Sequence, residues 1–261
     1  MTNSDRPTVS RLSSHEIYRY AITDSTNARL KAMAREGAAH GTVVMADEQT
    51  RGRGRFDRKW LSRPGDGAWF SVLVRPENVP AESAGGLVFL SALGMAQALN
   101  SLSPGAVTVK WPNDLIAGKR KIAGILSEMS ALDGRISWAV IGIGVNLAPC
   151  RFPEELPWAG SFENETGIAL SAPDCVSAFL SRFDRLYDEW LRFGLSPALS
   201  RILEISATVG RRVRITDADG HAFEADAVAL APDGALIVNE NGIARTLRAG
   251  DVSVRGLMDY A

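Results

Sequence analysis

Basic residues and glycines are concentrated in one short stretch, TRGRGRFDRKW, which runs from Thr50 to Trp60 and holds five basic side chains and two glycines. Because glycine has no Cβ, backbone amides in such a loop can approach phosphate oxygens closely. Arg53 and Arg55 could then close over a bound nucleotide anion, since charge-assisted hydrogen bonds contribute about 1.5–3 kcal/mol each when solvent is excluded. A solvated hairpin tip is the alternative interpretation, and the composition of the stretch favours neither.

A second group of polar residues lies in KWPNDLIAGKRKIAGILSEM, which begins at Lys110. Pro112 interrupts the strand pattern and places Asn113 and Asp114 at a corner. Lys121 follows a short basic turn and leads into an apolar strand. A carboxylate, an amide and a lysine together could orient a nucleophile and neutralise an acyl or phosphoryl group. A turn whose Asn and Asp cap backbone amides is the simpler alternative.

Two smaller groups complete the residues that could carry chemistry. Residues 25–27 (Ser-Thr-Asn) stand at a predicted helix start, where free amides either bind a polar ligand or are simply capped. In VIGIGVNL, Gly142 and Gly144 would let a ligand lie against a strand, and Asn146 would close its end. A sheet bulge explains these glycines equally well.

Composition limits the kind of partner. The 29 basic and 30 acidic residues nearly cancel, whereas proteins that coat nucleic acid usually carry a basic excess, so we expect a small anion and no nucleic acid. Cys150 and Cys175 show no paired spacing on which a zinc site or disulfide framework could be built. The N-terminus lacks the apolar core of a secretory signal, and the apolar runs are too short to span a bilayer. We expect a cytoplasmic protein without membrane contact.

Common nucleotide-binding and catalytic motifs do not match. The glycine stretches at 52–57 and 142–147 both lack the third glycine of G-x-G-x-x-G, and neither opens a βαβ unit. In the phosphate-loop pattern, Gly118 and Lys119 are followed by Arg120 rather than Ser or Thr. The sequence has no HExxH or GxSxG.

The elements that must position these residues follow from the hydrophobic pattern. DSTNARLKAMAREG predicts a helix that is capped at Asp24 or Ser25 and ends at Gly37. TVVMADEQ predicts a strand that leads into the basic loop, and GAWFSVLVRP predicts another that stops at Pro76. Further predicted elements are a buried helix over 87–102, strands in AVTVKWPND, IAGILSEMS and ISWAVIGIGVNL, an amphipathic helix over 174–194 and a short helix before Ala207.

The composition changes near Thr208. From there, short alternating strands separated by DG, DG and NG turns predict a small β-barrel of about five strands. We therefore expect an α+β protein, with a mixed central sheet and flanking helices in residues 1–207 and an SH3-like β-barrel in residues 208–261. The residues alone are compatible with a phosphate-binding loop, but they indicate no particular reaction.

Taken together, five segments resemble the biotin–protein ligases, also called biotin–[acetyl-CoA-carboxylase] ligases. They are DSTN at 24–27, GRGR…RKW at 52–60, KWPNDL at 110–115, RKIAGILSE at 120–128 and GIGVNL at 142–147, in the family's order and spacing. GDVSVR at 250–255 fits the family's C-terminal barrel. The resemblance covers nearly all of the chain from about Tyr20 and implies a class II synthetase-like catalytic domain.

The resemblance also implies a reaction in two steps. Biotin and ATP give biotinyl-5′-AMP and pyrophosphate, with Mg²⁺ expected to help neutralise the phosphates. A specific lysine of a biotin carboxyl carrier protein, part of acetyl-CoA carboxylase or a related carboxylase, then attacks the mixed anhydride. The family also forms dimers edge to edge through the central sheet, so a homodimer is a further partner that the resemblance allows.

The resemblance assigns roles to particular residues. The polar ureido end of biotin is expected near Ser25, Thr26 and Gln49, and Asp114 is expected to steer the incoming lysine. The expected catalytic residues are Lys121, Asp114, Arg53 and Arg55. The expected biotin-binding residues are Ser25, Thr26, Asn27, Gln49, Arg53, Gly54, Arg55, Lys121, Gly124, Gly142 and Gly144. The expected nucleotide-binding residues are Arg53, Arg55, Trp60, Lys110, Asn113, Lys121 and Asn146. The resemblance identifies no metal ligand.

The basic loop departs from the family pattern. The family usually has AGRGR, then a small or basic residue and Gly, whereas here Arg51 replaces Ala and Phe56 and Asp57 replace the last pair. We expect a stiffer loop in which Asp57 offsets one arginine, with the chemistry preserved. About twenty residues precede the first motif, too few for a three-helix DNA-binding module, so a monofunctional ligase is expected. The rivals are a lipoate–protein ligase, a non-catalytic binding module and an RNA-binding protein.

Overall fold

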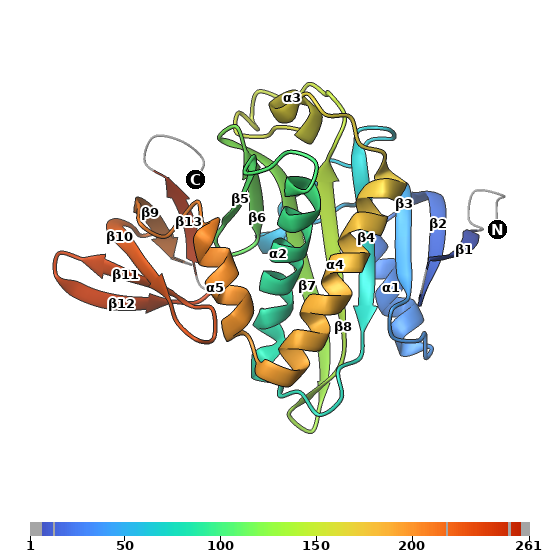
Figure 1. The fold of residues 1–261 in the computed structure, drawn as a ribbon, viewed down its shortest axis with the longest axis horizontal. Helices are drawn as coiled ribbons and strands as arrows, with labels where there is room; N and C mark the ends of the chain where they lie inside the picture. The colour runs from blue at the N-terminus through green and yellow to red at the C-terminus, as the bar shows by residue number, and fades with distance from the viewer. Residues whose placement is uncertain (1–6, 13, 218, 250–251, 257–261) are drawn as a thin grey trace.

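The framework of the protein is an eight-stranded mixed sheet, seen here in a computed structural model that describes residues 7–12, 14–217, 219–249 and 252–256 (Figure 1). Its order is β1-β2-β3-β4-β8-β7-β6-β5. The β2–β3 pair is parallel, and the other pairs are antiparallel. The strands are β1 (Thr8–Leu12), β2 (His15–Thr23), β3 (Val43–Gln49), β4 (Gly67–Val74), β5 (Val107–Lys110), β6 (Asp114–Ala117), β7 (Arg120–Leu132) and β8 (Arg135–Asn146). The predicted mixed sheet is confirmed.

Helices cover both faces of this sheet. Alternate residues of β3 point to opposite faces, because Val43 and Met45 belong to one core cluster and Val44 and Ala46 belong to another. The first cluster includes residues of α2 (Gly86–Asn100), α4 (Ala172–Phe193) and α5 (Ser196–Glu204), which lie together on one face in Figure 1. The second includes Leu30 of α1 (Thr26–Arg35). The site residues that begin α1 therefore lie on the face away from α2, α4 and α5.

Local signals account for the helix ends. Ser25 caps α1, because its side chain accepts a hydrogen bond from the amide of Ala28, and Gly37 follows the helix at a φ of +94°. Ser171 caps α4 in the same way through the amide of Asp174. The predicted boundaries of both helices are confirmed within a few residues.

The structure contains elements that the sequence pattern did not separate. β1 and β2 precede the first motif, and β6 follows directly on the predicted corner, where Lys110 pairs with Asp114. Among the described residues up to 207, there are also a short helix, α3 (Phe162–Thr166), and two 3₁₀ turns, Arg55–Asp57 and Ala81–Gly85. The corner itself is as predicted.

The C-terminal residues form a second, antiparallel sheet of five strands in the order β12-β11-β10-β9-β13. These are β9 (Arg212–Asp217), β10 (Ala222–Leu230), β11 (Leu236–Glu240), β12 (Ile243–Leu247) and β13 (Val252–Gly256). The number of strands is as expected. Within the described residues β12 and β13 do not pair, so the sheet is open and the expected barrel closure is corrected.

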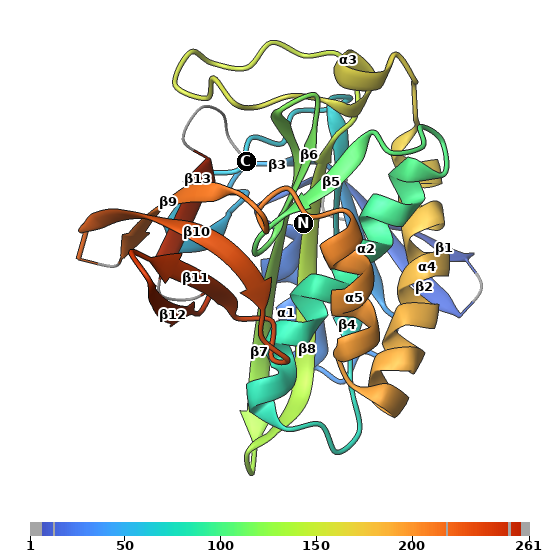
Figure 2. The ribbon, with the colours of Figure 1, turned by 60° about the vertical axis from the view of Figure 1, so that its left-hand side comes forward.

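The second sheet packs beside the β5–β6 edge of the first, as Figure 2 shows. The indole nitrogen of Trp111 donates to the carbonyl oxygen of Gly234 at 2.9 Å, and Lys110 Nζ donates to that of Val254 at 2.8 Å. β13 is thereby held against the corner that precedes β6. In the part of the chain that the structure describes, no helix is both long and apolar enough to cross a membrane.

Candidate active site

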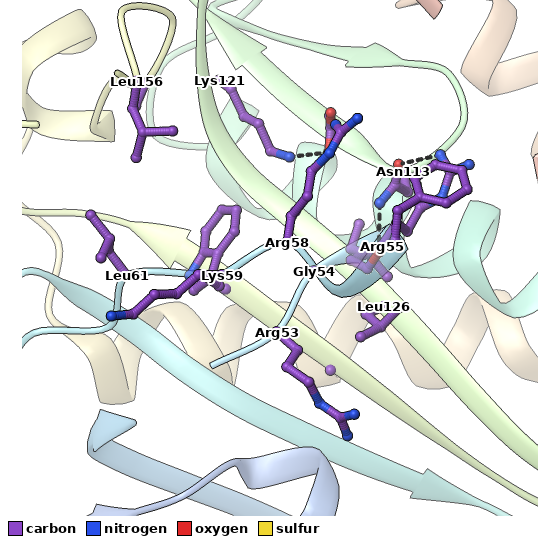
Figure 3. A pocket seen from close by; sticks show the side chains of 18 of the residues that line it. Arg53, Gly54, Arg55, Arg58, Lys59, Leu61, Asn113, Lys121, Leu126 and Leu156 are labelled. Carbon is purple, nitrogen blue, oxygen red and sulfur yellow. Dashed lines mark hydrogen bonds and ion pairs between the residues drawn. The ribbon is translucent and has the colours of Figure 1, made fainter. Parts of the chain in front are cut away.

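A cavity of about 500 Å³ opens between the basic loop, the start of α1, strands β7 and β8, and β13. Figure 3 shows the side chains of the basic loop together with Asn113, Lys121 and Leu156 around it. Every residue that the sequence predicted for the site lines this cavity, namely Ser25, Thr26, Asn27, Gln49, Arg53, Gly54, Arg55, Trp60, Lys110, Asn113, Asp114, Lys121, Gly124, Gly142, Gly144 and Asn146. The fold therefore brings five separate segments to one place.

The end of the cavity near α1 contains several neutral polar groups. Gln49 Oε1 accepts from the backbone amide of Thr26 at 2.8 Å and lies 3.1 Å from the Thr26 hydroxyl. Because the Thr26 backbone amide can only donate, it fixes the orientation of the Gln49 side chain, whose Nε2 then donates to Ser62 Oγ at 2.9 Å. Ser71, fully buried on β4, lies 2.8 Å from the Thr26 hydroxyl and 2.6 Å from Asn27 Oδ1. This end can recognise a small neutral group with several donors and acceptors.

The opposite end contains a buried ion pair. Lys121 Nζ lies 2.6 Å from Asp114 Oδ1, and the Asp114 side chain is only 8% exposed. The same ammonium lies 5.2 Å from the centre of the Trp60 ring, within the range of a cation–π interaction. Lys121 is therefore held in place from two sides before any ligand arrives.

Lys110 is almost completely buried beside this pair. Burial lowers the pKa of Lys110 to about 8, and the neighbouring charges of Lys121, Arg255 and Arg55 act in the same direction, against the opposing effect of Asp114. Because its ammonium donates to Val254, Lys110 serves to tie β5 to β13. The predicted contact of Lys110 with a nucleotide remains a prediction.

The strand glycines make room for protein side chains. A Cβ at Gly144 would lie 2.5 Å from Trp60 Nε1, and one at Gly124 would lie 3.0 Å from Trp60 Cζ3. A Cβ at Gly142 would lie 2.2 Å from Asn27 Oδ1. The sheet keeps regular register through these positions, so the alternative of a bulge is wrong here. The glycines seat Trp60 and Asn27, and those side chains face the cavity.

The basic loop is partly tied down. Arg55 donates to Asn113 Oδ1 at 3.3 Å and to the carbonyl oxygens of Ala249 and Val252, the latter at 3.2 Å. Arg53 is 44% exposed and lies 3.9 Å from Glu128 Oε1. Arg53 and Arg58 extend from the loop in different directions in Figure 3.

Phe56 gives the loop its shape. This residue has a φ of +55°, a left-handed conformation that is uncommon for a bulky side chain. The guanidinium groups of Arg55 and Arg58 lie 4.8 and 5.7 Å from its ring centre. The side chain of Asp57 lies outside the described part of the structure, so its expected effect on the arginines remains a prediction.

Sequence reasoning missed several cavity residues. Glu128 ends a motif that was recognised, but no role was given to it, although a carboxylate in an apolar strand was a visible signal. The segment over residues 152–159 contributes Leu156 and Trp158 at the mouth, and Arg255 enters from β13. This segment carries no periodic pattern, and its position depends on backbone pairing of Lys121 with residues 158 and 160.

Comparison with known proteins identifies the family of the chain. Residues 19–146 match the model of the Biotin/lipoate A/B protein ligase family, and residues 208–255 match the Biotin protein ligase C terminal domain. The first match defines a class of ligases for biotin or lipoate. The biotin–[acetyl-CoA-carboxylase] ligase of Mycobacterium tuberculosis is 33% identical, over 89% of this chain and 86% of that protein. The chain therefore belongs to the biotin protein ligases.

Further relatives cover the chain to a similar extent. The biotin–[acetyl-CoA-carboxylase] ligase of Paracoccus denitrificans is 32% identical over 90% of this chain and 99% of its own length. The structure of the Aquifex aeolicus biotin protein ligase in complex with biotin and ATP superposes with a TM-score of 0.79 at 26% identity. It covers 92% of this chain and 98% of the Aquifex chain.

Proposed function

We propose that the protein is an ATP-dependent biotin–[biotin carboxyl-carrier protein] ligase. It forms biotinyl-5′-AMP and then transfers the biotinyl group to a lysine of a carrier protein of acetyl-CoA carboxylase or a related carboxylase. One observation carries the proposal: the neutral polar groups of Thr26 and Gln49 and the cationic groups of Arg53, Arg55 and Lys121 line one cavity. The Aquifex structure with biotin and ATP and the named relatives support it.

In the first step, a carboxylate oxygen of biotin attacks the α-phosphorus of ATP, and pyrophosphate leaves. The ureido ring would lie against the start of α1, which places the carboxylate near Lys121 and the basic loop. The two arginines and Lys121 would neutralise charge that accumulates around the α-phosphate. Trp60, seated on β7 and β8, would cover the chain of biotin and exclude water from the anhydride.

In the second step, a neutral lysine amine of the carrier attacks the acyl carbon, and AMP leaves. The amine arrives as an ammonium and must lose a proton before or during attack. Asp114, which is paired with Lys121 in the resting protein, is our candidate for accepting the incoming ammonium. Asn113 would hold the corner, since its side-chain amide donates to the carbonyl oxygen of Ile125 at 2.8 Å.

We propose that Mg²⁺ enters with the phosphates of ATP. In the described part of the chain, the one group of three carboxylate or imidazole side chains close enough to share an ion is Asp217, Asp219 and His221, in the β9–β10 turn. Mg²⁺ commonly keeps several waters and binds phosphates with one or two protein oxygens. Asn146 is a candidate for this role, because it lines the cavity and its Nδ2 donates to the carbonyl oxygen of Gly160.

We also propose that residues 1–207 and 208–261 divide the work. The first part supplies the substrate contacts. The second closes the cavity through Val254 and Arg255 and anchors Arg55 by backbone carbonyl groups. This division gives the C-terminal sheet a direct part in holding the basic loop.

The test is mass spectrometry of purified protein incubated with Mg-ATP and biotin, with lipoate in a parallel sample. Biotinyl-AMP from biotin alone is the expected result. Lipoyl-AMP instead would assign the protein to the lipoate ligases, and the absence of any adenylate would favour a non-catalytic binding protein. Adding a biotin carboxyl carrier protein then tests transfer, read as the mass increase of one biotinyl group.

A further inference from the structure

The carboxylate of Glu128 has no role in the reaction proposed above, although it lines the cavity. Its two oxygens accept from different donors, Oε1 from Lys31 Nζ at 2.5 Å and Oε2 from Asn27 Nδ2 at 2.8 Å. Burial raises the pKa of Glu128, but the hydrogen bonds from Lys31 and Asn27 outweigh burial and leave the pKa below its usual value. Glu128 is therefore an ionised group that only accepts hydrogen bonds.

The protein itself satisfies most of the hydrogen-bonding capacity of the Asn27 side-chain amide. Nδ2 donates to Glu128 and also to the carbonyl oxygen of Leu126 at 3.3 Å, while Oδ1 lies 2.6 Å from the hydroxyl of Ser71. Since both partners of Nδ2 can only accept, the nitrogen and oxygen of the amide cannot be exchanged. The Asn27 amide also packs closely against β8, since a Cβ at Gly142 would lie 2.2 Å from Oδ1. One lone pair of Oδ1 remains for a ligand.

We propose that Glu128 is a positioning residue that fixes the Asn27 amide so that Asn27 offers a ligand an acceptor and not a donor. The inference rests on the proposed function and deepens it. The ureido ring of biotin carries two N–H donors that match such an acceptor, whereas the dithiolane ring of lipoate carries none. Glu128 thereby favours a ureido substrate without touching it.

The decisive change is Glu128→Gln. The carboxylate accepts hydrogen bonds from Lys31 and Asn27 with separate oxygens, whereas the side chain of glutamine has only one oxygen to accept with. If that oxygen accepts from Lys31, the new NH₂ group faces Asn27 Nδ2, and the Asn27 amide either loses this bond or turns over and sets its oxygen against the carbonyl oxygen of Leu126. We expect biotin, titrated by calorimetry without ATP, to bind about 10-fold more weakly. The KM for biotin should rise by a similar factor, and kcat should change less than about threefold.

Two control variants separate this effect from simple loss of an ion pair. Lys31→Met removes the pair but leaves the bond from Asn27 to Glu128, so biotin affinity at pH 8 should stay within about twofold of the wild type. Asp47→Asn makes the same chemical change in a surface pair, where Asp47 binds Arg19 at 2.8 Å. An equal loss in Lys31→Met and Glu128→Gln would overturn the proposal.

Arg53 provides the remaining competing explanation, because it lies 3.9 Å from Glu128. The Glu128→Gln change is therefore repeated in an Arg53→Ala background, where the same fractional loss of biotin affinity is expected. A loss that disappears in that background would assign the effect to Arg53 and overturn the proposal.

Failure of the proposed function would look different. It would show as a wild-type protein that neither binds biotin nor forms biotinyl-AMP. Unchanged biotin binding and KM in Glu128→Gln, with an active wild type, would overturn only the positioning role. Thermal unfolding of each variant confirms that the folded protein is being compared.

Discussion

Asp114 has two proposed roles, pairing with Lys121 and receiving the carrier lysine, and experiments can separate them. It pairs with Lys121 in the resting protein, and we propose that it later receives the ammonium of the carrier lysine. For Asp114→Asn we expect transfer to the carrier to slow by about 100-fold or more, the usual contribution of a proton-accepting group. Adenylate formation should fall by less than about 10-fold. The two half-reactions are measured separately, by quenched-flow detection of biotinyl-AMP and by carrier mass; equal losses in both would contradict the assignment.

Arg55 is expected to retain the activated intermediate. Its guanidinium joins the basic loop to Asn113 and to backbone carbonyl groups near β13. Arg55→Gly should therefore let the loop open and release biotinyl-AMP into solution, at a rate seen by separating free from bound nucleotide. Lys59→Ala, at a neighbouring exposed position of the same loop, is the matched change and should release less. Retention equal to the wild type in Arg55→Gly would count against the clamp.

Sequence patterns predicted which residues gather at the cavity but not how they are used. Arg53, Lys121 and Asp114 carry charges whose chemistry is visible in the sequence. The role of the strand glycines is not visible in the sequence: Trp60 fills the space above Gly124 and Gly144, so a side chain at either position would collide with it. A clash between strand and loop, separated by more than sixty positions, is a tertiary property that no local pattern contains. Glu128 stands out in the sequence as a carboxylate in an apolar strand, but its contact with Asn27 is again a tertiary property.

At the level of elements, the start of β2 is tied to α4 through a buried histidine. His15 Nδ1 lies 2.8 Å from the carbonyl oxygen of Gly41, and Nε2 lies 3.0 Å from an oxygen of Asp184. The Gly41 carbonyl and the Asp184 carboxylate are hydrogen-bond acceptors, so a protonated ring donates to both at once, and this favours the charged form of His15. The hydrogen bond to Asp184 raises the pKa of His15 above 6.5, and burial only partly opposes it.

This contact predicts a pH-dependent stability. A raised folded pKa means that the contribution is complete below pH 6.5, the value of the unfolded chain, and is lost as pH rises through the folded pKa. The difference in unfolding free energy between wild type and His15→Gln should therefore shrink with rising pH, measured by urea titration at several pH values. His40→Gln is the control, because burial lowers the pKa of His40 and its difference should change with the opposite sign.

Long periodic elements were predictable, and short ones were not. α4 shows its capping serine, its proline and a long apolar stripe, so its sequence determines both ends. β6 has four residues and becomes a strand only because β5 and β7 flank it. β1 is largely exposed and gains its structure from pairing with β2. Such edges depend on partners from elsewhere in the sequence.

At the scale of the whole molecule, the hairpin before β11 fastens the second sheet to the first. Gly234 has a φ of +84°, and a Cβ there would lie 2.2 Å from Phe89 of α2. Gly234→Ala should destabilise the protein by about 2 kcal/mol or more, since it combines left-handed strain with a steric clash. Calorimetry and adenylate formation should both register the loss, because β13 helps to hold Arg55.

Gly220 offers a matched control for this prediction. It has a φ of +85° in the β9–β10 turn, but no atom of the described residues lies within 4 Å of the position that a Cβ would take there. Gly220→Ala should introduce the backbone strain without the clash. It should therefore cost less stability than Gly234→Ala and leave adenylate formation normal. Equal effects of the two substitutions would mean that the contact with Phe89 does not anchor the second sheet.

The environment of the Trp60 indole also predicts a change in fluorescence. Its indole rests on two glycines beside the ammonium of Lys121 and is only partly exposed, so its surroundings change when a substrate replaces water in the cavity. Indole emission moves to shorter wavelength as its environment becomes less polar. Substrate binding should therefore change the fluorescence of the protein, and Trp60→Phe should reduce that change, although Trp111 and Trp158 also line the cavity. A natural tryptophan thus allows each turnover to be followed without a label.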